Sequence, residues 1–373
     1  MSSATDPERR TGAIPSQGMP LYSVQALTEV FVCPSCRGEL QADAQGPRCP
    51  KCSTRGRLLA GSLVDFLGGD DSHAQAILGW REDQVPSLED AVTQATKSME
   101  ADPRAPVALS LEQAALLRDL DLLGPDGRLT PLGRTVGYNS SEFRWQSNYD
   151  PLEGLATTPE LTPESRVLDL GGGSGQTLRR LFPEPKGTVV CLDPNPDVLA
   201  YGVKLFSTYG LNALFCRGSA HSLPFRDDYF DHIICRCVIN YVHQKRALKE
   251  AFRVLRPGGW MFLRLENIYW DFNTLPQARD LLNLAFRLRL LFWGLIHSGL
   301  GCQPTPGGKI AGFRAYVSPR RFRRILASLD AQIVRYEPSR RGPQYRGHGT
   351  QDVALCIRRP VEALHDLAVP DFQ

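Results

Sequence analysis

The chain has 373 residues and a formal net charge of +3, with 42% hydrophobic and 22% charged residues. This length predicts two or three domains, and the composition is typical of a globular protein. The net charge is too small to indicate a nucleic-acid partner by itself.

Two terminal segments, 1–28 and 361–373, are predicted to be tails outside the globular part. The first has no apolar core, so it lacks the pattern of a secretory signal peptide. The longest apolar run, 281–296, is interrupted by Arg287 and Arg289 and is shorter than the ~20 residues that a membrane span needs. We therefore expect a cytoplasmic protein without a transmembrane segment.

Residues 29–68 contain two Cys-Pro-X-Cys pairs with twelve residues between them. The four cysteines are Cys33, Cys36, Cys49 and Cys52. This spacing is typical of a zinc ribbon, in which two tight turns bring four thiolates around one tetrahedral ion. Four sulfur ligands leave no open position for catalysis, so we predict a structural Zn²⁺ ion. A unit this small cannot bury enough core alone, and the metal would supply folding energy.

Residues 69–145 are predicted to form a helical linker. Ser110 and Gln113 have the spacing of a capping box at the start of a helix. Glycine and proline in 124–134 then predict a tight hairpin. A helix followed by a small hairpin also resembles the end of a winged helix, and both interpretations of this segment stay open.

Residues 146–360 alternate between apolar strands and helices, which predicts one α/β domain. Its mostly parallel, Rossmann-like sheet of seven strands would be covered by helices on both faces. The expected strands are 166–172, 187–194, 212–218, 231–240, 260–267, 331–338 and 351–359. The expected helices begin at 176, 196, 244 and 318, and the third is expected to continue to Gly259.

A glycine-rich turn follows the first of these strands. Gly171, Gly173 and Gly175 allow the backbone to turn tightly and to approach a ligand closely. A dinucleotide fingerprint needs a small residue where this chain has Gln176. Asp169, two residues before the first glycine, would repel a pyrophosphate but suits a cation. These features favour S-adenosylmethionine over NAD.

Asp193 ends the second strand of the domain. A carboxylate at this position can accept hydrogen bonds from both ribose hydroxyls of a nucleoside. NAD-binding enzymes use such an acid too, so Asp193 alone does not distinguish the two cofactors.

Several motifs in order make the chain similar to the class I S-adenosylmethionine-dependent methyltransferases, in the branch that includes quinone and small-molecule methyltransferases. They are "VLDLGGGSG", Asp193, "GSAHSLPF", "FDHIICRCVINYV" and "AFRVLRPGG". The resemblance implies that Asp169 and the glycine backbone lie near the methionine part of the cofactor. It implies that Asp193, with Pro194 beside it, holds the ribose.

The chain departs from this family at Ser219, where the family often has an acid that contacts the adenine amino group. Ser219 can still accept a hydrogen bond, although more weakly than a carboxylate. The adenine contact is then expected to involve backbone atoms, Ala220 or His221.

The methyl acceptor must be aligned with the sulfonium, and for some acceptors a proton must also be removed. Candidate catalytic residues at the carboxyl ends of the strands are His221, Tyr241 and His243. Histidine titrates near neutral pH and could act as a base. For both His221 and His243, the alternative is an ordinary loop histidine without a catalytic role.

Residues 267–317 form an insertion rich in apolar and aromatic side chains. In the family, insertions here cover the acceptor pocket, so we predict a lid over a bulky or lipid-like acceptor. An ordinary buried helix hairpin is the alternative. The overlapping segment 309–346 has ten Lys or Arg residues against two acids. A solvent-exposed helix face would account for most of these basic residues. The alternative is that they bind an anionic acceptor.

Three functions are consistent with these motifs. The first is an S-adenosylmethionine-dependent methyltransferase that acts on a small-molecule or lipid-like acceptor, with oxygen expected ahead of carbon or nitrogen. The second is a zinc-ribbon methyltransferase that acts on rRNA or tRNA bases. The third is a non-catalytic binding or scaffold protein that keeps the methyltransferase fold.

Overall fold

The fold is described from a computed structural model of the chain. The described residues are 24–43, 45–60, 62–102, 107–145, 161–182, 184–266, 272, 275–278, 280–300, 315–316, 319–339 and 352–359. Residues 1–23 and 361–373, both predicted tails, lie outside this set. Residues 24–28 of the first predicted tail belong to helix α1 (Val24–Val30) instead. Leu27 and Val30 anchor this helix because both are buried in the core.

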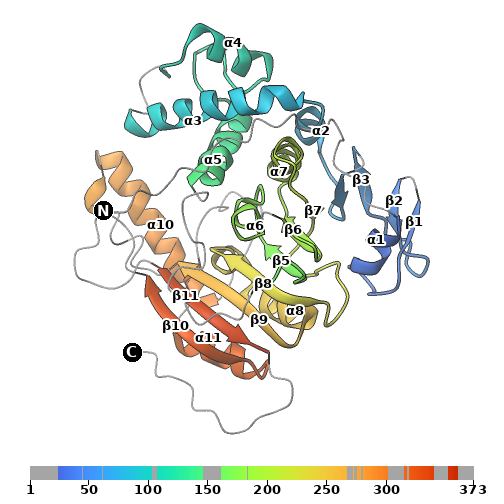
Figure 1. Cartoon of the computed structure of the whole chain (residues 1–373). Helices are drawn as coiled ribbons and strands as arrows, with labels where there is room; N and C mark the ends of the chain where they lie inside the picture. Colours follow the sequence, from blue (N-terminus) through green and yellow to red (C-terminus); the bar gives the residue numbers. More distant parts are fainter. Residues whose placement is uncertain are drawn as a thin grey trace, which may run out of the picture.

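A nine-stranded sheet forms the centre of the molecule, in the order β10-β11-β9-β8-β5-β6-β7-β4-β3 (Figure 1). The strands are β3 (Arg57–Leu59), β4 (Leu63–Asp65), β5 (Val167–Leu170), β6 (Val189–Asp193), β7 (Leu214–Arg217), β8 (Phe230–Arg236), β9 (Leu255–Glu266), β10 (Gln332–Ser339) and β11 (Asp352–Arg358). The six neighbouring strands from β9 through β8, β5, β6 and β7 to β4 pair in parallel. Strand β11 is antiparallel to both of its neighbours, β9 and β10. The predicted seven-stranded, mostly parallel sheet is confirmed in β5 to β11.

Both faces of this sheet are covered, as the alternation of strands and helices predicted. Helices α6 (Gln176–Leu181) and α7 (Pro196–Thr208) pack on one face. Helices α8 (Gln244–Val254) and α11 (Pro319–Ala327) pack on the other. Successive strand residues point to opposite faces, so neighbours such as Val190 and Cys191 belong to different core clusters.

Helix α8 ends five residues earlier than the sequence predicted. Strand β9 begins directly at Leu255, which pairs with Phe230 of β8. The predicted end at Gly259 was wrong because this strand pairing takes the backbone of 255–259 out of the helix. Gly258 N also donates a hydrogen bond to Arg359 O, at 2.8 Å, beside the next strand.

Four α-helices are described between residues 72 and 145. The helices are α2 (Ser72–Leu78), α3 (Val85–Ala101), α4 (Leu111–Asp119) and α5 (Pro131–Trp145). The capping box of α4 is confirmed: Gln113 N donates to Ser110 Oγ, and Ser110 N donates to the Gln113 side chain. The predicted hairpin is reduced to one bridge, between Leu123 and Leu129, and it joins α4 to α5.

The cysteine-rich unit is joined to the large sheet through the second of its two hairpins. It contains the small hairpin β1 (Gln41–Asp43) and β2 (Gly46–Arg48), drawn in blue at one side of Figure 1. The following hairpin, β3 and β4, extends the large sheet because β4 pairs in parallel with β7. The unit therefore continues the sheet of the following domain.

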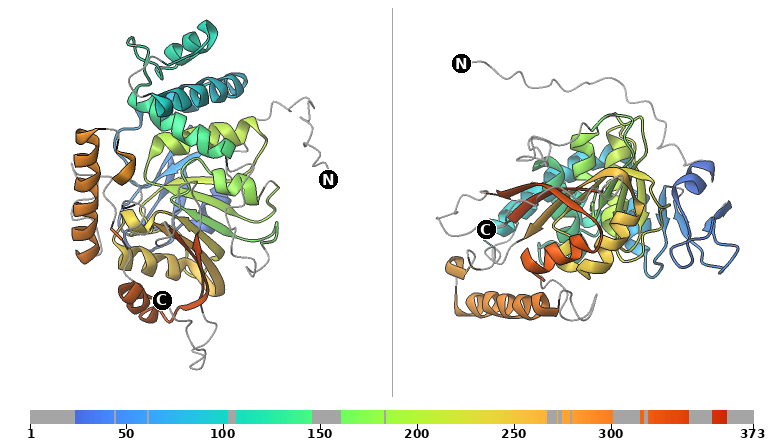
Figure 2. Two further views of the ribbon diagram at one scale, coloured as in Figure 1. Left: turned by 90° about the vertical axis from the view of Figure 1, so that its left-hand side faces the viewer. Right: turned by 90° about the horizontal axis from the view of Figure 1, so that it is seen from below.

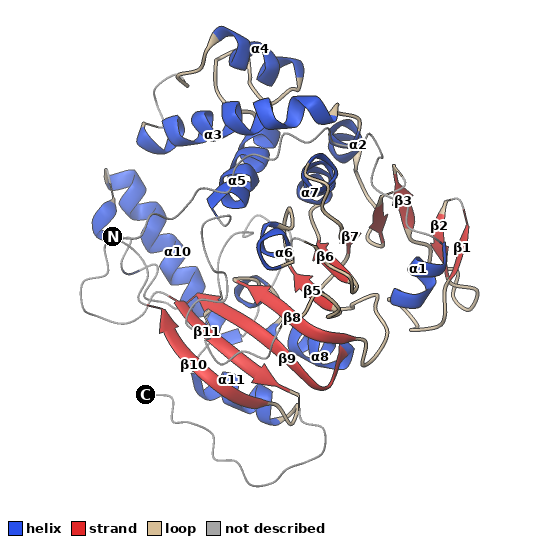
Figure 3. Cartoon of the chain, viewed as in Figure 1, coloured by secondary structure: helices blue, strands red, loops and turns tan. Residues whose placement is uncertain are grey.

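Secondary structure in the predicted insertion 267–317 is described mainly for α10 (Leu281–Leu300). This helix lies at the margin of the molecule in both views of Figure 2. No helix among the described residues is both long and apolar enough to span a bilayer. Figure 3 shows that α10 and α5 lie on the side of the molecule toward which β5 and β8 end.

Candidate active site

The glycine-rich turn lies between β5 and α6. Gly171, Gly173 and Gly175 have φ values of 73°, 56° and 78°, in the left-handed region that favours glycine. A Cβ atom at Gly171 would lie 2.2 Å from the Val238 side chain. The turn can therefore pass this close to the end of β8 only because Gly171 has no side chain. The predicted tight turn is confirmed.

A cavity of about 700 Å³ opens above this turn. Its lining residues come from four parts of the chain. They are Asp169 of β5, Gly171, Gly172 and Gly173 of the turn, and Gln176 and Thr177 of α6; Asp193, Asn195 and Val198 at and after the end of β6; Arg236, Cys237, Val238 and Tyr241 at and after the end of β8; and Pro131, Arg134, Thr135, Tyr138, Asn139 and Glu142 of α5. Its position at the carboxyl ends of parallel strands is where α/β folds bind ligands.

Asp169 is buried at the floor of this cavity, with 2% of its surface exposed. Burial raises the pKa of its carboxyl to about 7, and the nearby Asp193 adds to this effect while Arg236 opposes it. Its Oδ2 atom has no hydrogen-bond partner among the described residues. Such a buried acceptor is costly unless a ligand pairs with it. The cavity therefore fits a ligand with a cationic or hydrogen-bond-donating group at this point.

Asp193 ends β6 and joins two loops at the same cavity. Its Oδ1 accepts a hydrogen bond from Asn195 N at 2.9 Å, and its Oδ2 accepts one from Gly173 N at 3.2 Å. Burial raises the pKa of its carboxyl to about 6, although these two bonds oppose the shift. The carboxylate remains able to accept further hydrogen bonds, as recognition of a ribose needs.

The predicted cofactor residues fall into two groups. Asp169, Gly171, Gly173 and Asp193 line the cavity. Outside its lining are Gly175, Pro194, Ser219, Ala220 and His221. The segment 218–221 nevertheless begins beside Asp193, because Gly218 N donates to Asp193 O at 3.2 Å.

Of the three predicted catalytic residues, only Tyr241 lines the cavity. His221 Nε2 accepts a hydrogen bond from His243 N at 2.9 Å, and burial lowers the pKa of His221. His243 Nδ1 accepts from Arg246 N and caps α8. The His221 ring therefore joins two loops, whereas the His243 ring caps the helix that follows its own loop.

Helix α5 forms a wall of the cavity that the sequence motifs did not reveal. Asn139 is buried, and its Oδ1 lies 3.1 Å from the position of a Cβ atom at Gly173. The sequence pattern predicts a hairpin over 124–134, whereas Pro131 is the first residue of this helix. The available signal was Thr130, whose hydroxyl accepts from Gly133 N at 2.9 Å, followed by proline at the first helical position.

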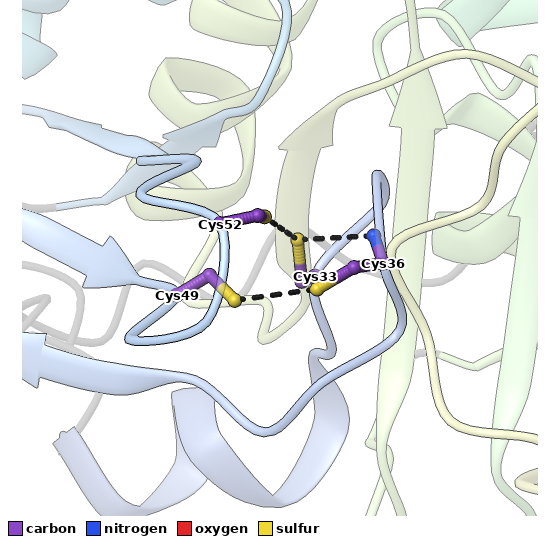
Figure 4. A group of neighbouring side chains, drawn as sticks. All are labelled: Cys33, Cys36, Cys49 and Cys52. Carbon is purple, nitrogen blue, oxygen red and sulfur yellow. Dashed lines mark hydrogen bonds between the residues drawn. The ribbon is translucent and has the colours of Figure 1, made fainter.

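The four predicted metal ligands come together, as shown in Figure 4. All four Sγ atoms lie within 4.8 Å of one another. Cys33 Sγ lies 3.4 Å from Cys52 Sγ, and Cys36 Sγ lies 3.5 Å from Cys49 Sγ. Tetrahedral zinc with bonds of about 2.3 Å would separate its sulfurs by about 3.8 Å. The cluster therefore fits a four-sulfur metal site with little rearrangement.

The first cysteine turn contacts the segment that follows Gly218. Ser222 Oγ donates to Pro34 O at 2.5 Å, and Val32 N donates to Pro224 O at 2.9 Å. Arg37 also forms an ion pair of 2.6 Å with the largely buried Glu250. The cysteine-rich unit therefore supports a loop that begins beside Asp193.

Comparison with known proteins identifies the domain around the cavity. The model of a family described as "Methyltransferase domain" matches residues 167–259. The chain is 37% identical over 136 residues to the ubiquinone/menaquinone biosynthesis C-methyltransferase UbiE of Vibrio vulnificus strain YJ016, covering 32% of this chain and 52% of the relative. The UbiE of Bartonella quintana is 36% identical over 137 residues, with the same coverage of both chains. The chain spans about half the length of the curated relatives it matches.

Among solved structures, an S-adenosylmethionine-dependent methyltransferase from Aquifex aeolicus aligns with a TM-score of 0.38 and 17% identity, covering 59% of this chain and 97% of that one. The sequence relatives, the matched segment and the cavity at the glycine-rich turn agree with one another. The chain therefore carries a class I S-adenosylmethionine-dependent methyltransferase domain that is related to the UbiE methyltransferases.

Proposed function

We propose that this protein transfers a methyl group from S-adenosylmethionine to a small, apolar acceptor of lipid-like character. The observation that carries the proposal is the buried carboxylate of Asp169 at the floor of the cavity. Its unpartnered Oδ2 atom suits a cofactor that carries two positively charged groups, an ammonium and a sulfonium. When bound, S-adenosylmethionine supplies a methyl group on an activated sulfur.

The residues around the cavity divide the work of binding. Asp169 and the backbone of Gly171 and Gly173 would hold the methionine part of the cofactor, and Asp193 would hold the ribose. Helix α5 would cover the cofactor, since Asn139 and its neighbours face the glycine-rich turn. Such a cover excludes water and restricts the acceptor to the open side, toward Tyr241.

We propose carbon as the acceptor atom, ahead of the oxygen that the sequence motifs favoured. The curated relatives are C-methyltransferases in quinone biosynthesis, which supports both an apolar acceptor and transfer to carbon. Transfer to carbon also releases a proton from the acceptor, and neither His221 nor His243 lines the cavity, so we assign that proton to neither histidine. Tyr241 is then the residue that would contact the acceptor.

We also propose that Cys33, Cys36, Cys49 and Cys52 hold a structural Zn²⁺ ion. The separations of the sulfur atoms support this assignment, as does the absence of any non-sulfur ligand in the cluster found among the described residues. The ion would stabilise the turns that contact Pro224 and Ser222.

Calorimetric titration with S-adenosylmethionine tests the cofactor assignment. We expect the wild-type chain to bind, and Asp193→Ala and Asp169→Asn each to lose roughly tenfold or more in affinity, since each removes a charged hydrogen-bond acceptor worth about 1.5–3 kcal/mol. The exposed Asp126→Asn is the matched control and should bind normally. Wild-type protein that fails to bind would refute the proposal.

The pH dependence gives a second test. The raised pKa values of Asp169 and Asp193 mean that the ligand-free folded chain holds more protons than the unfolded chain between about pH 4 and pH 7. Its stability should therefore decrease as the pH rises through this window, and Asp169→Asn should reduce the decrease. Cofactor affinity should instead fall as the pH drops. Protonation of Asp169 below about pH 7, and then of Asp193 below about pH 6, removes the negative charges that attract the ligand.

Transfer of a labelled methyl group into cell extract tests the acceptor class. We expect label in the lipid and small-molecule fraction, and much less of it with Asp193→Ala at a limiting concentration of S-adenosylmethionine. Label in RNA would favour the rRNA or tRNA alternative, and binding of the cofactor without any transfer would favour the scaffold alternative.

A further inference from the structure

Helix α10 exposes an apolar face to solvent. The apolar side chains of this face recur on one side of the helix. They are Leu282, Phe286, Phe292, Leu295, Ile296 and Leu300. Their exposed fractions range from 38% for Ile296 to 84% for Leu282. All six remain exposed in the part of the chain that the structure describes. Exposed apolar surfaces of this kind mark sites that bind another molecule or a membrane.

The opposite side of α10 is fixed to the wall of the cofactor cavity. Gly294 lies against the Tyr316 ring, and Tyr316 N donates to Ser298 Oγ at 2.7 Å. The preceding residue, Ala315, donates its N–H to Asn240 O at 2.8 Å. Asn240 is followed by Tyr241, which lines the cavity. The helix is therefore held in place on its inner side, while the apolar face points away.

A basic cluster lies at the carboxyl end of the same helix. Arg321 of α11 donates hydrogen bonds to the carbonyls of Ser298, Gly299 and Leu300, at 3.0 to 3.2 Å. Arg321 also lines a second cavity, of about 340 Å³, together with His243, Lys245, Arg324 and Ile325. Among the lining residues that the structure describes, none is acidic, and Lys245, Arg321 and Arg324 give them a positive charge.

We propose that the apolar face of α10 and the basic cluster of Lys245, Arg321 and Arg324 form one surface that binds an anionic lipid bilayer. An interfacial helix places its apolar side among the acyl chains, while neighbouring basic residues attract anionic headgroups. The partner is a lipid surface because it supplies both apolar contact and negative charge. The helix lies on the bilayer, since it is not apolar enough to span one.

This surface would bring the cofactor cavity to the place where an apolar acceptor dissolves. The chain of contacts from α10 through Ala315 and Asn240 to Tyr241 joins the bound helix to the cavity wall. This step rests on the proposed function, whereas binding to the bilayer does not.

Flotation of the full-length protein with lipid vesicles tests the surface. We expect binding to vesicles of phosphatidylcholine with phosphatidylglycerol, and much weaker binding to phosphatidylcholine alone. The double variant Leu282→Ser/Phe286→Ser should weaken binding roughly tenfold, by loss of buried apolar area. The double variant Lys245→Gln/Arg324→Gln should also weaken it, by roughly fivefold per charge, and should reduce its dependence on salt.

The matched control is Leu111→Ser, which changes a leucine that is 90% exposed on α4. It should bind vesicles as the wild type does. Thermal unfolding and calorimetry with S-adenosylmethionine accompany each variant, and both should stay unchanged, because the altered residues lie outside the core and the cofactor cavity.

Wild-type protein that binds S-adenosylmethionine but not anionic vesicles would overturn this inference and leave the proposed function intact. Vesicle binding without cofactor binding would refute the proposed function and leave this inference intact. Equal vesicle binding by the wild type and the Leu282→Ser/Phe286→Ser variant would also overturn it. So would light scattering that shows a wild-type dimer dissociated by that variant, since a second copy of the chain would then cover the face.

Discussion

Two regions have been added to the same methyltransferase sheet, and they are attached in opposite ways. The cysteine-rich unit extends the sheet through β4 and buries Phe31 completely, with its ring centroid 5.4 Å from that of Phe225. Helix α10, at the other side of Figure 1, is held on its inner side and leaves its apolar face exposed. The first region completes the fold, whereas the second leaves a surface available for a partner.

The way in which an added segment is attached to the sheet indicates its role. Pairing with an edge strand satisfies backbone hydrogen bonds along the added strand, and side chains on both sheet faces join the existing cores. A helix satisfies its own backbone and can therefore remain with one apolar side unburied. We expect changes in the cysteine-rich unit to affect stability and cofactor binding, and changes on the apolar face of α10 to affect neither.

The largest expected effect is that of Cys49→Ser. Loss of one thiolate should abolish metal binding and lower the melting temperature by on the order of 10 °C, because the metal supplies much of the folding energy of the small unit. Metal content per chain and thermal unfolding measure this effect. The control is Cys237→Ser, which lies outside the cluster and should keep the metal. Full metal content in Cys49→Ser would contradict the zinc assignment.

The second prediction compares two phenylalanines directly. Phe31→Ala should lower the free energy of unfolding by about 3–5 kcal/mol, because it leaves a cavity between Phe66 and Phe225. Phe286→Ala, on α10, should change it by less than about 0.5 kcal/mol, since this side chain is 53% exposed. Urea unfolding measures both. Similar losses in the two variants would show that α10 is packed as closely as the cysteine-rich unit.

The smallest expected effect is that of Ser222→Ala. It removes the hydrogen bond to Pro34 O that supports the loop beginning beside Asp193. We expect affinity for S-adenosylmethionine to fall by roughly two- to fivefold, in keeping with about 1 kcal/mol for one hydrogen bond, with metal content unchanged. Ser207→Ala, another partly buried serine, is the control. Unchanged affinity in Ser222→Ala would mean that the cysteine-rich unit supports stability alone.

Much of the candidate site was predictable because its signals are local. The strand, the three glycines and Asp169 lie within nine residues. The backbone conformation of the glycines and the charge of Asp169 follow directly from their residue types. The cysteine pairs are equally local. Asp193 was predictable from its place at the end of the next strand, because parallel strands end at one edge of a sheet.

Other parts of the site depended on contacts between distant segments. Helix α5 lines the cavity at the glycine-rich turn, although 131–145 is separated from this turn by more than twenty residues and carries no motif for a ligand. His221 and His243 had suitable chemistry and sequence positions. The His221 ring instead accepts a hydrogen bond from His243 N, the His243 ring caps α8, and neither residue lines the cavity.

The sequence by itself therefore determined the α/β domain, the glycine-rich turn, the two carboxylates beside it and the four clustered cysteines, because periodicity, spacing and residue type encode these over short distances. The tertiary structure alone decided that the cysteine-rich unit extends the sheet, that α5 closes the cavity and that α10 leaves an apolar face exposed. Each of these depends on which surfaces meet after the chain has folded, and burial of surface between remote segments is a property of the whole packing.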